Sequence, residues 1–169
     1  IRTLEHDAVR VRIEVFEPAE RESALRIGLA QAISAGELMD LTVQKAVELG
    51  AVWIHPLIAR RSKVRLEGDR AERRVQHWQR VAIAACEQCG RNRLPQVAPV
   101  LALADWLGTR SITQRGILLD PASSLRLSQA GPMEGEIALL AGAESGFTAE
   151  ENEMAQHRGF VAVSLGPRV

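Results

Sequence analysis

The sequence predicts an α/β domain built on a parallel sheet, and three observations carry this prediction. Residues 137–141 are a short apolar run without alternation, which is typical of a strand covered on both faces. A glycine loop follows, and Thr148 with Glu151 three residues later forms a capping-box pattern that predicts a helix start. Gly159 ends this helix, and a second strand is expected over 160–165. Together these elements form a βαβ unit, whose loops lie where open parallel sheets bind ligands.

The first two dozen residues predict the end of a separate β domain. Valine and isoleucine alternate with charged residues over Ala8–Phe16, which is typical of a half-buried antiparallel strand. The polar stretch Glu17–Ser23 contains Pro18 and predicts a linker. We therefore expect residues 1–24 to be the C-terminal remnant of a small β domain and residues 25–169 to form the main domain.

The main domain begins with two predicted strands and the helix between them. We expect a strand over 25–33 and a helix over 39–49, with Gly50 after its last turn. The second strand, 52–58, contains Pro56, which we expect near a strand end. A cationic loop, Arg60 to Arg65, follows at the edge of the sheet where a substrate would be met. The helix should bury a face that carries Met39, Val43, Ala46 and Val47.

The longest predicted helix runs from Asp69 to Gly90. Trp78 on its apolar stripe is expected in a core or interface, although a base-stacking role is the alternative. The turn after the helix projects Arg91 and Arg93, whose guanidinium groups match phosphate oxygens. A short helix and a strand are then expected over 102–107 and 116–119. The buried stripe of the long helix should contain Val75, Trp78, Val81, Ala82, Ala85 and Cys89.

Charge is distributed unevenly along the chain. The formal net charge is zero, which by itself argues against nucleic-acid binding. Residues 55–93, however, contain ten Lys or Arg and four acidic residues, a net of plus six, whereas residues 134–153 contain six Glu and no Lys or Arg. The basic middle is either a positive surface for an anionic partner or a set of solvated helix faces.

Several functional classes are disfavoured. Cys86 and Cys89 form a C-x-x-C pair, but no second pair completes a tetrahedral site and the pair lies late in a helix. We therefore expect no metal and no redox role. Neither a G-x-G-x-x-G sequence nor a Walker loop is present, which disfavours dinucleotides and nucleoside triphosphates. No apolar run approaches the ~20 residues that span a bilayer, and no leader opens the chain, so a cytoplasmic location without membrane contact is expected.

Three loops are predicted to converge at one edge of the sheet. Leu119–Pro121, Gly142–Phe147 and Leu165–Val169 each follow a predicted strand, and the carboxyl ends of parallel strands meet at the same edge. Glycines in these loops allow main-chain groups to approach a ligand closely. From the residues alone, the prediction is a nucleotide-like ligand.

The pairing of LLAGAESGFTAEE with GFVAVSLGPRV resembles the bacterial 16S rRNA (uracil-N3)-methyltransferases, which are SPOUT-class enzymes with a trefoil-knotted cofactor site. Two further stretches, MDLTVQKAVELG over 39–50 and IAACEQCGRNRLP over 83–95, resemble the same family. The resemblance covers roughly residues 25–169. It implies a parallel-sheet SPOUT methyltransferase domain, incomplete at its C-terminus, preceded by the end of a PUA-like β-barrel that helps to bind RNA.

The resemblance also implies that the three loops hold S-adenosylmethionine. Gly142, Glu144 and Gly146 match the family's G-P-E-G-G, and residues 165–168 match its L-G-P-R. Ala143 replaces the usual Pro, which lowers the stability of the loop by ~0.5 to 1 kcal/mol because the unfolded chain has more conformational entropy. Ser145 replaces a Gly, which is unfavourable if that position needs positive φ. The expected cofactor-binding residues are Leu119, Asp120, Pro121, Gly142, Ala143, Glu144, Gly146, Leu165, Gly166 and Val169.

Methylation of uracil N3 requires a deprotonated nitrogen in line with the methyl donor, so positioning and electrostatics should carry most of the rate. Arg168 and Arg91 are the candidates for stabilising negative charge on the uracil oxygens, and Glu144 is a candidate base or orienting group. The structural alternatives are that Arg168 pairs with a carboxylate and that Glu144 interacts with the dipole of the helix starting near Thr148.

The expected substrate is 16S rRNA, within a small-subunit ribosomal particle, and the expected assembly is a homodimer. Phosphate contacts should dominate the affinity. Aromatic residues make up 4% of the chain and Tyr is absent, which disfavours a stacking platform. The target base is expected to be splayed out of its helix. The residues expected to contact RNA are Lys45, Arg61, Arg91 and Arg93.

The chain begins at Ile1 and stops inside the L-G-P-R motif, so we expect both ends to be incomplete. In the family this motif continues into a helix that threads the knot, and a protein that truly ended at Val169 would be inactive. Ala143, Ser145 and the missing tail also motivate a rival interpretation, a non-enzymatic rRNA-binding protein of the same fold. A nucleotide-binding enzyme unrelated to RNA is the third interpretation.

Overall fold

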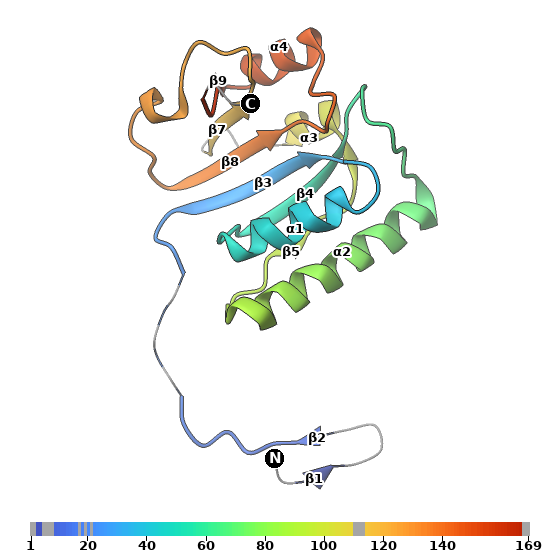
Figure 1. Cartoon of the computed structure of the whole chain (residues 1–169), viewed down its shortest axis with the longest axis vertical. Coiled ribbons are helices and arrows are strands. Elements are labelled where there is room, and N and C mark those ends of the chain that lie inside the picture. Colours follow the sequence, from blue (N-terminus) through green and yellow to red (C-terminus); the bar gives the residue numbers. More distant parts are fainter. Residues whose placement is uncertain are drawn as a thin grey trace.

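The main domain is a parallel α/β fold, as predicted. A computed structural model describes residues 3–4, 9–16, 18, 20, 22–109 and 114–166. Its seven-stranded sheet has the order β5-β4-β3-β8-β7-β9, with β6 also paired to β4, and every pairing is parallel (Figure 1). The strands are β3 (Arg26–Ala32), β4 (Trp53–Ile58), β5 (Gln96–Val97), β6 (Leu101–Ala102), β7 (Arg115–Leu119), β8 (Glu136–Ala141) and β9 (Phe160–Val163).

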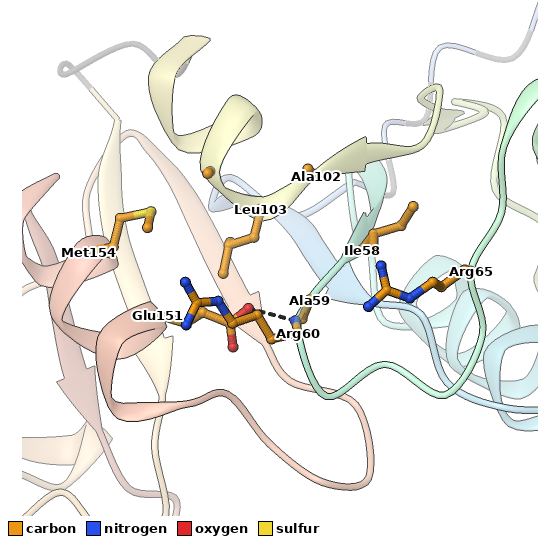
Figure 2. Close-up of a pocket in the computed structure, with 9 residues that line it drawn as sticks. Ile58, Ala59, Arg60, Arg65, Ala102, Leu103, Glu151 and Met154 are labelled. Atoms are coloured by element: carbon orange, nitrogen blue, oxygen red, sulfur yellow. Dashed lines mark hydrogen bonds between the residues drawn. The ribbon is translucent and has the colours of Figure 1, made fainter.

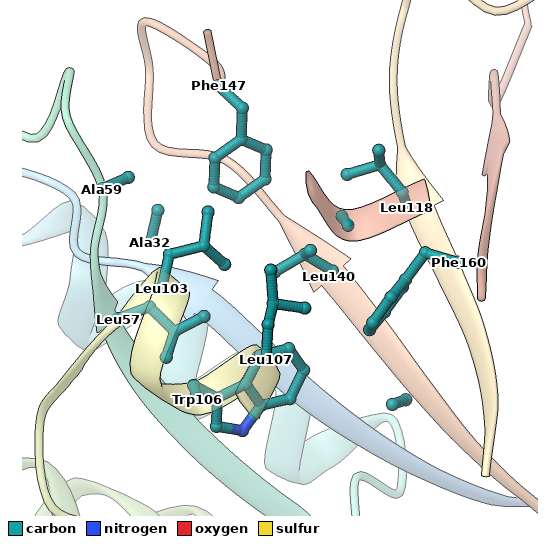
Figure 3. Packing of buried hydrophobic residues seen from close by; sticks show 13 residues of the cluster. Ala32, Leu57, Ala59, Leu103, Trp106, Leu107, Leu118, Leu140, Phe147 and Phe160 are labelled. Carbon is teal, nitrogen blue, oxygen red and sulfur yellow. The ribbon is translucent and has the colours of Figure 1, made fainter. Parts of the chain in front are cut away.

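Helices cover both faces of the sheet, because its strands are apolar on both sides. On one face α1 and α2 pack over β3 and β4, with Trp78 fully buried between them, which confirms its place in the core. On the other face α3 and α4 enclose a second cluster, in which Trp106, Leu140 and Phe160 meet (Figure 3). The helices are α1 (Leu38–Glu48), α2 (Gly68–Cys89), α3 (Leu103–Thr109) and α4 (Ala149–His157), with a 3-10 turn at Leu127–Gln129.

Local signals set the start of α4 and the end of α2 as the sequence predicts, whereas α2 begins at Gly68 without the predicted side-chain cap from Asp69. The Thr148 hydroxyl accepts a hydrogen bond from the Glu151 amide at 3.2 Å, and the Glu151 carboxylate accepts one from the Thr148 amide at 2.9 Å. This capping box starts α4 directly after the glycine loop. At the other end of the domain Gly90 closes α2 in the left-handed conformation, with φ of 76°. Of the two cysteines, Cys86 is buried and Cys89 is exposed, so the expectation that Cys89 belongs to the buried stripe was wrong.

Pro56 lies inside β4 rather than near its end, and the sheet accommodates it through its short neighbours. Two short strands pair with β4 on the side away from β3. The strand β5 pairs with Trp53 and Ile54, and β6 pairs with Leu57 and Ile58. Pro56 therefore lies opposite the gap between β5 and β6, where no neighbouring strand requires a hydrogen bond from its nitrogen.

The N-terminal segment departs from its prediction. β1 (Thr3–Leu4) pairs antiparallel with β2 (Val9–Arg10), away from the main sheet (Figure 1). Val9, Val11, Ile13 and Val15 are 57%, 60%, 87% and 80% exposed. The expectation of a half-buried strand over Ala8–Phe16 was therefore wrong for these side chains, since among the described residues nothing packs against them. Membership of a β-barrel stays a prediction.

At the opposite edge of the sheet from the loops, Trp53 crosses over β3 to reach β8. Its indole nitrogen donates to the Glu136 carboxylate at 2.9 Å, and Gln114 donates to the same carboxylate oxygen at 2.6 Å. Gly28 lies directly beneath the ring, and a Cβ at this position would come within 1.8 Å of it. The absence of a side chain at Gly28 is what allows this link between strands.

The burial of His55 on β4 predicts that the stability of the fold depends on pH. Burial lowers the pKa of its imidazole, partly opposed by a hydrogen bond with the Pro99 backbone, and no described residue bonds its buried Nε2. The pKa of His55 in the folded state lies below its unfolded value of about 6.5, so as the pH falls the unfolded chain takes up the imidazole proton first. The free energy of unfolding is therefore highest above that pH and decreases as the pH falls. Urea midpoints should drop between about pH 7.5 and about pH 5.5. His55→Gln should flatten this slope, and an unchanged slope would contradict the assignment.

Within the described ranges no helix is both long and apolar enough to cross a membrane. In the same part of the chain no group of three or more His, Cys, Asp or Glu residues is arranged to hold a metal ion.

Candidate functional site

A cavity of about 290 Å³ lies at the carboxyl ends of β7, β8 and β9. The loops after these three strands, which the sequence predicts to converge, all line it. Gly166 is described but is not among the lining residues, and Pro167, Arg168 and Val169 lie outside the described residues. The cavity is lined by Leu119, Asp120, Pro121, Ala141, Gly142, Ala143, Glu144, Gly146, Val163 and Leu165.

The loop from Gly142 to Phe147 folds tightly back on itself. A Cβ at Gly142 would lie 2.9 Å from the Cα of Gly146 and 3.3 Å from the Phe147 nitrogen, so only glycine fits there. Gly146 has φ of 64° and donates to the Ala143 carbonyl at 2.9 Å. In the described chain no residue other than glycine has positive φ, so Ser145 occupies its position without backbone strain. Phe147, 8% exposed, anchors the loop in the core (Figure 3).

Gln31 holds the start of this loop from the neighbouring strand. Its side-chain amide donates to the Gly142 carbonyl at 2.8 Å and to the Ala32 carbonyl at 2.9 Å, and the residue is only 6% exposed. Sequence reasoning missed Gln31. The available signal was a polar residue in the middle of an otherwise apolar strand, which must find partners when it is buried.

Glu144 fastens the loop to the turn after β3. Its carboxylate accepts a hydrogen bond from the Ala35 amide at 3.0 Å. Hydrogen bonds from its own backbone amide and then from Ala35 hold the pKa of Glu144 below the usual value, although the side chain is solvent-exposed. A carboxylate with a lowered pKa is a weak proton acceptor, so the geometry favours an orienting role for Glu144. The cap of α4 is supplied by Thr148 and Glu151 instead.

Asp120 connects the first loop to α4. One carboxylate oxygen accepts from the Ala122 amide at 3.0 Å, and the other accepts from the Asn152 side chain at 3.3 Å. These bonds fix the carboxylate at the cavity wall, where it can accept hydrogen bonds from ligand hydroxyl groups or face a positive charge.

Arg61 braces the glycine loop from the cationic loop between β4 and α2. Its guanidinium Nη1 donates to the carbonyls of Ser145 at 3.1 Å and Phe147 at 3.2 Å. The neighbouring Arg60 amide donates to Glu151 at 2.7 Å. The cationic loop is thereby joined to the glycine loop by a side chain and to α4 by a main-chain bond.

The other predicted RNA-contacting residues lie elsewhere. Arg91 is at the amino edge of the sheet, where its guanidinium makes a bidentate pair with Glu22, at 2.9 and 2.6 Å, and donates to the carbonyls of Val47 and Ala51. The structure does not bring it to the cavity within this chain. Arg93 pairs with Glu20 at 2.5 Å beside it, and Lys45 on α1 pairs with Glu48 at 2.7 Å.

The contacts of Arg91 predict that replacing it destabilises the fold. The Arg91 and Glu22 side chains are only 10% and 13% exposed, and breaking such a pair leaves a buried charge without its partner. Arg91→Ala should lower the free energy of unfolding by about 3 kcal/mol. Arg93→Ala, which removes a pair with 62% and 47% exposed side chains, should change it by less than about 1 kcal/mol. Urea unfolding measures both. An Arg91→Ala variant of parental stability with weakened RNA binding would contradict this and favour the RNA role.

Comparisons with known proteins place these features in a family. A family model described as RNA methyltransferase domain matches residues 21–169. A ribosomal RNA small subunit methyltransferase E from Buchnera aphidicola is 30% identical over 161 residues, covering 94% of this chain and 64% of the relative. A second protein of this name, from Bacillus subtilis, is 25% identical and is covered to 69%.

Solved structures agree with the sequence relatives. A ribosomal RNA small subunit methyltransferase E from Neisseria gonorrhoeae, determined with bound S-adenosyl methionine, has a TM-score of 0.86 and 38% identity, covering 90% of this chain and 63% of that one. A methyltransferase from Legionella pneumophila in complex with the same cofactor has a TM-score of 0.82 and 39% identity, covering 88% and 61%. The chain thus spans somewhat less than two thirds of the length of these structures. The chain belongs to the RNA methyltransferase domain family.

Proposed function

We propose that the protein transfers a methyl group from S-adenosylmethionine to N3 of a specific uridine in 16S rRNA. The observation that carries this proposal is the cavity at the carboxyl ends of β7, β8 and β9, formed by the three loops in a chain 38% identical to a relative with bound S-adenosyl methionine. The relatives' name, ribosomal RNA small subunit methyltransferase E, supports the class of substrate.

The residues of the cavity fit such a cofactor. At Gly142 the main chain approaches so closely that a Cβ would collide with Gly146. Gly142, Ala143 and Gly146, which carry small side chains or none, line the cavity. Asp120 supplies a fixed carboxylate at the wall. The unstrained backbone at Ser145 removes one motive for the non-enzymatic interpretation, so the geometry favours the enzyme.

When bound, S-adenosylmethionine supplies an electrophilic methyl group on a sulfonium centre. The chain's own contribution is to hold the reacting groups in line and to exclude water. Gln31, Glu144 and Arg61 keep the loop 142–147 in one conformation, so that little reorganisation is needed at the moment of reaction. Arg168 is the proposed group for stabilising negative charge on the uracil oxygens, and it follows the last described turn of the cavity.

The proposed RNA contacts centre on the cationic loop 60–65, which lies at the same edge of the sheet as the cavity. Arg61 is already joined to the cavity wall, and contributions from Lys45 and Arg93 are proposed as phosphate contacts at a greater distance. We also propose that the protein acts as a homodimer in the cytoplasm, on rRNA within a small-subunit particle. An apolar groove of about 520 Å³ between α1 and β8, lined by Leu41, Leu49 and Leu139 among others, supports the homodimer.

The test is transfer of a labelled methyl group by the full-length gene product. Purified small ribosomal subunits and free 16S rRNA lacking the modification are each incubated with the protein and S-adenosylmethionine carrying a deuterated methyl group. The rRNA is then digested to nucleosides for mass spectrometry. The proposal predicts label in 3-methyluridine alone. Label in another nucleoside would refute the N3 assignment, and no label in either substrate would refute the enzyme.

A further inference from the structure

A second cavity, of about 210 Å³, opens between the end of β4 and the helix α4 (Figure 2). Its lining comes from the end of β4, from the segment that joins β6 to α3, and from α4. It shares no lining residue with the cavity formed by the three loops. The methyltransferase chemistry proposed above does not use it.

The walls of this second cavity are mainly apolar. Ile58, Leu103 and Met154 supply large side chains to them (Figure 2). Ala102 and Ala104 are exposed and line the same cavity, so small residues stand where larger ones would close it. Such a cavity accommodates a flat, apolar-faced group without requiring an aromatic platform.

Two arginines line the same cavity. The Arg60 side chain is 69% exposed, and its ion pair with Glu150, at 3.9 Å between two exposed groups, is weak. Arg65 is also exposed. Both oxygens of Glu151 already accept backbone hydrogen bonds, at 2.7 Å from Arg60 and 2.9 Å from Thr148. Since this carboxylate is engaged, the cavity presents two guanidinium groups beside apolar walls, which suits an anion attached to an apolar ring.

We propose that this cavity is a subsite for one unpaired nucleotide of the substrate RNA, distinct from the methylated one. The base fills the apolar space, and its phosphate is bound by Arg60 and Arg65 through charge-assisted hydrogen bonds. The proposal rests on the proposed function for the identity of the RNA. The bound nucleotide is not the target, because this cavity shares no lining residue with the one that would hold the methyl donor.

The subsite gives the enzyme a way to set the register of its substrate. A strand that places one base here and the target at the other cavity must bridge two sites whose walls are tied together. Arg61 bonds the glycine loop, and the Arg60 amide bonds Glu151 of α4. Phosphate contacts alone fix orientation but not sequence position. A seated neighbouring base therefore contributes to the choice of the uridine that is methylated.

The test is RNA binding by the full-length protein, measured by fluorescence anisotropy with fluorescein-labelled decauridylate over a range of salt concentrations. Ala104→Leu fills the cavity without changing charge, so it should weaken binding about fivefold or more with an unchanged salt slope. Arg65→Gln should weaken binding and reduce the salt slope by about one. Arg73→Gln, on the exposed surface of α2, removes the same charge elsewhere and serves as the control.

Three results would overturn the subsite: an Ala104→Leu variant with parental affinity, an Arg73→Gln variant that loses as much as Arg65→Gln, or a parent protein that does not bind the probe at low salt. If Ala104→Leu fails to fold, Ala102→Leu fills the same cavity and decides the question. The affinity for S-adenosylmethionine should be unchanged in all variants. A parent that binds RNA but methylates none refutes the proposed function, while the comparison of variants still decides the subsite.

Discussion

Replacing Gly142 with alanine is expected to weaken cofactor binding strongly while leaving the domain folded. The added Cβ would lie 2.9 Å from the Gly146 Cα and 3.1 Å from its carbonyl carbon, and both are backbone atoms that cannot rotate away. The loop must open, and the Gln31 bond to the Gly142 carbonyl is strained with it. We expect the affinity for S-adenosylmethionine, measured by calorimetric titration of the full-length protein, to fall at least about thirtyfold, or about 2 kcal/mol.

Gly108→Ala is the matched control for this variant. Gly108 lies in α3 without positive φ, and a Cβ there meets nothing within 4 Å. The Gly108→Ala variant should therefore bind the cofactor with the affinity of the parent protein. A Gly142→Ala variant with parental affinity would show that the tight loop is not part of the cofactor site.

Replacing Gly28 with alanine is expected to destabilise the fold strongly. The new Cβ would lie 1.8 to 2.2 Å from the indole of Trp53, a rigid ring held by its hydrogen bond to Glu136. Either the ring is expelled, which breaks the Trp53 bond to Glu136 and opens a void, or β3 and β4 move apart. Both lower the free energy of unfolding, by about 3 kcal/mol. Urea unfolding followed by circular dichroism measures this change.

A double-mutant cycle separates this clash from a general intolerance of alanine in β3. Once Trp53→Ala has removed the ring, Gly28→Ala should be nearly neutral, so that the two changes are strongly non-additive. An equal loss from Gly28→Ala in both backgrounds would mean that the contact with Trp53 is not the reason for glycine at this position.

Local signals in the sequence were sufficient for the main elements of the fold. The capping box at Thr148 and Glu151, the glycine after α2 and the apolar run of β8 each depend on neighbours within a few residues, so they could be identified without knowing the fold. The convergence of the three loops followed from one rule, that parallel strands end at the same edge.

The partners of individual side chains could not be predicted in this way, because they depend on which strands are neighbours. Gln31 reaches Gly142 only because β3 and β8 are adjacent and in register. Arg91 was expected to meet phosphate, but the fold brings Glu22 to it and supplies its acceptors from within the chain. The alternation over Ala8–Phe16 predicts a strand with one covered face, and the described residues contain nothing that covers it. Periodicity shows which face is apolar but not what packs against it.

The proposed function requires that the cavity of the three loops hold S-adenosylmethionine. The most direct test is a crystal structure of the full-length protein grown with S-adenosylmethionine at saturating concentration. If the cofactor binds there, its density lies against the loops after β7, β8 and β9, in contact with the main chain of Gly142 and Gly146. Density in the apolar groove beside α1, or an empty loop cavity at saturation, would contradict the proposed function.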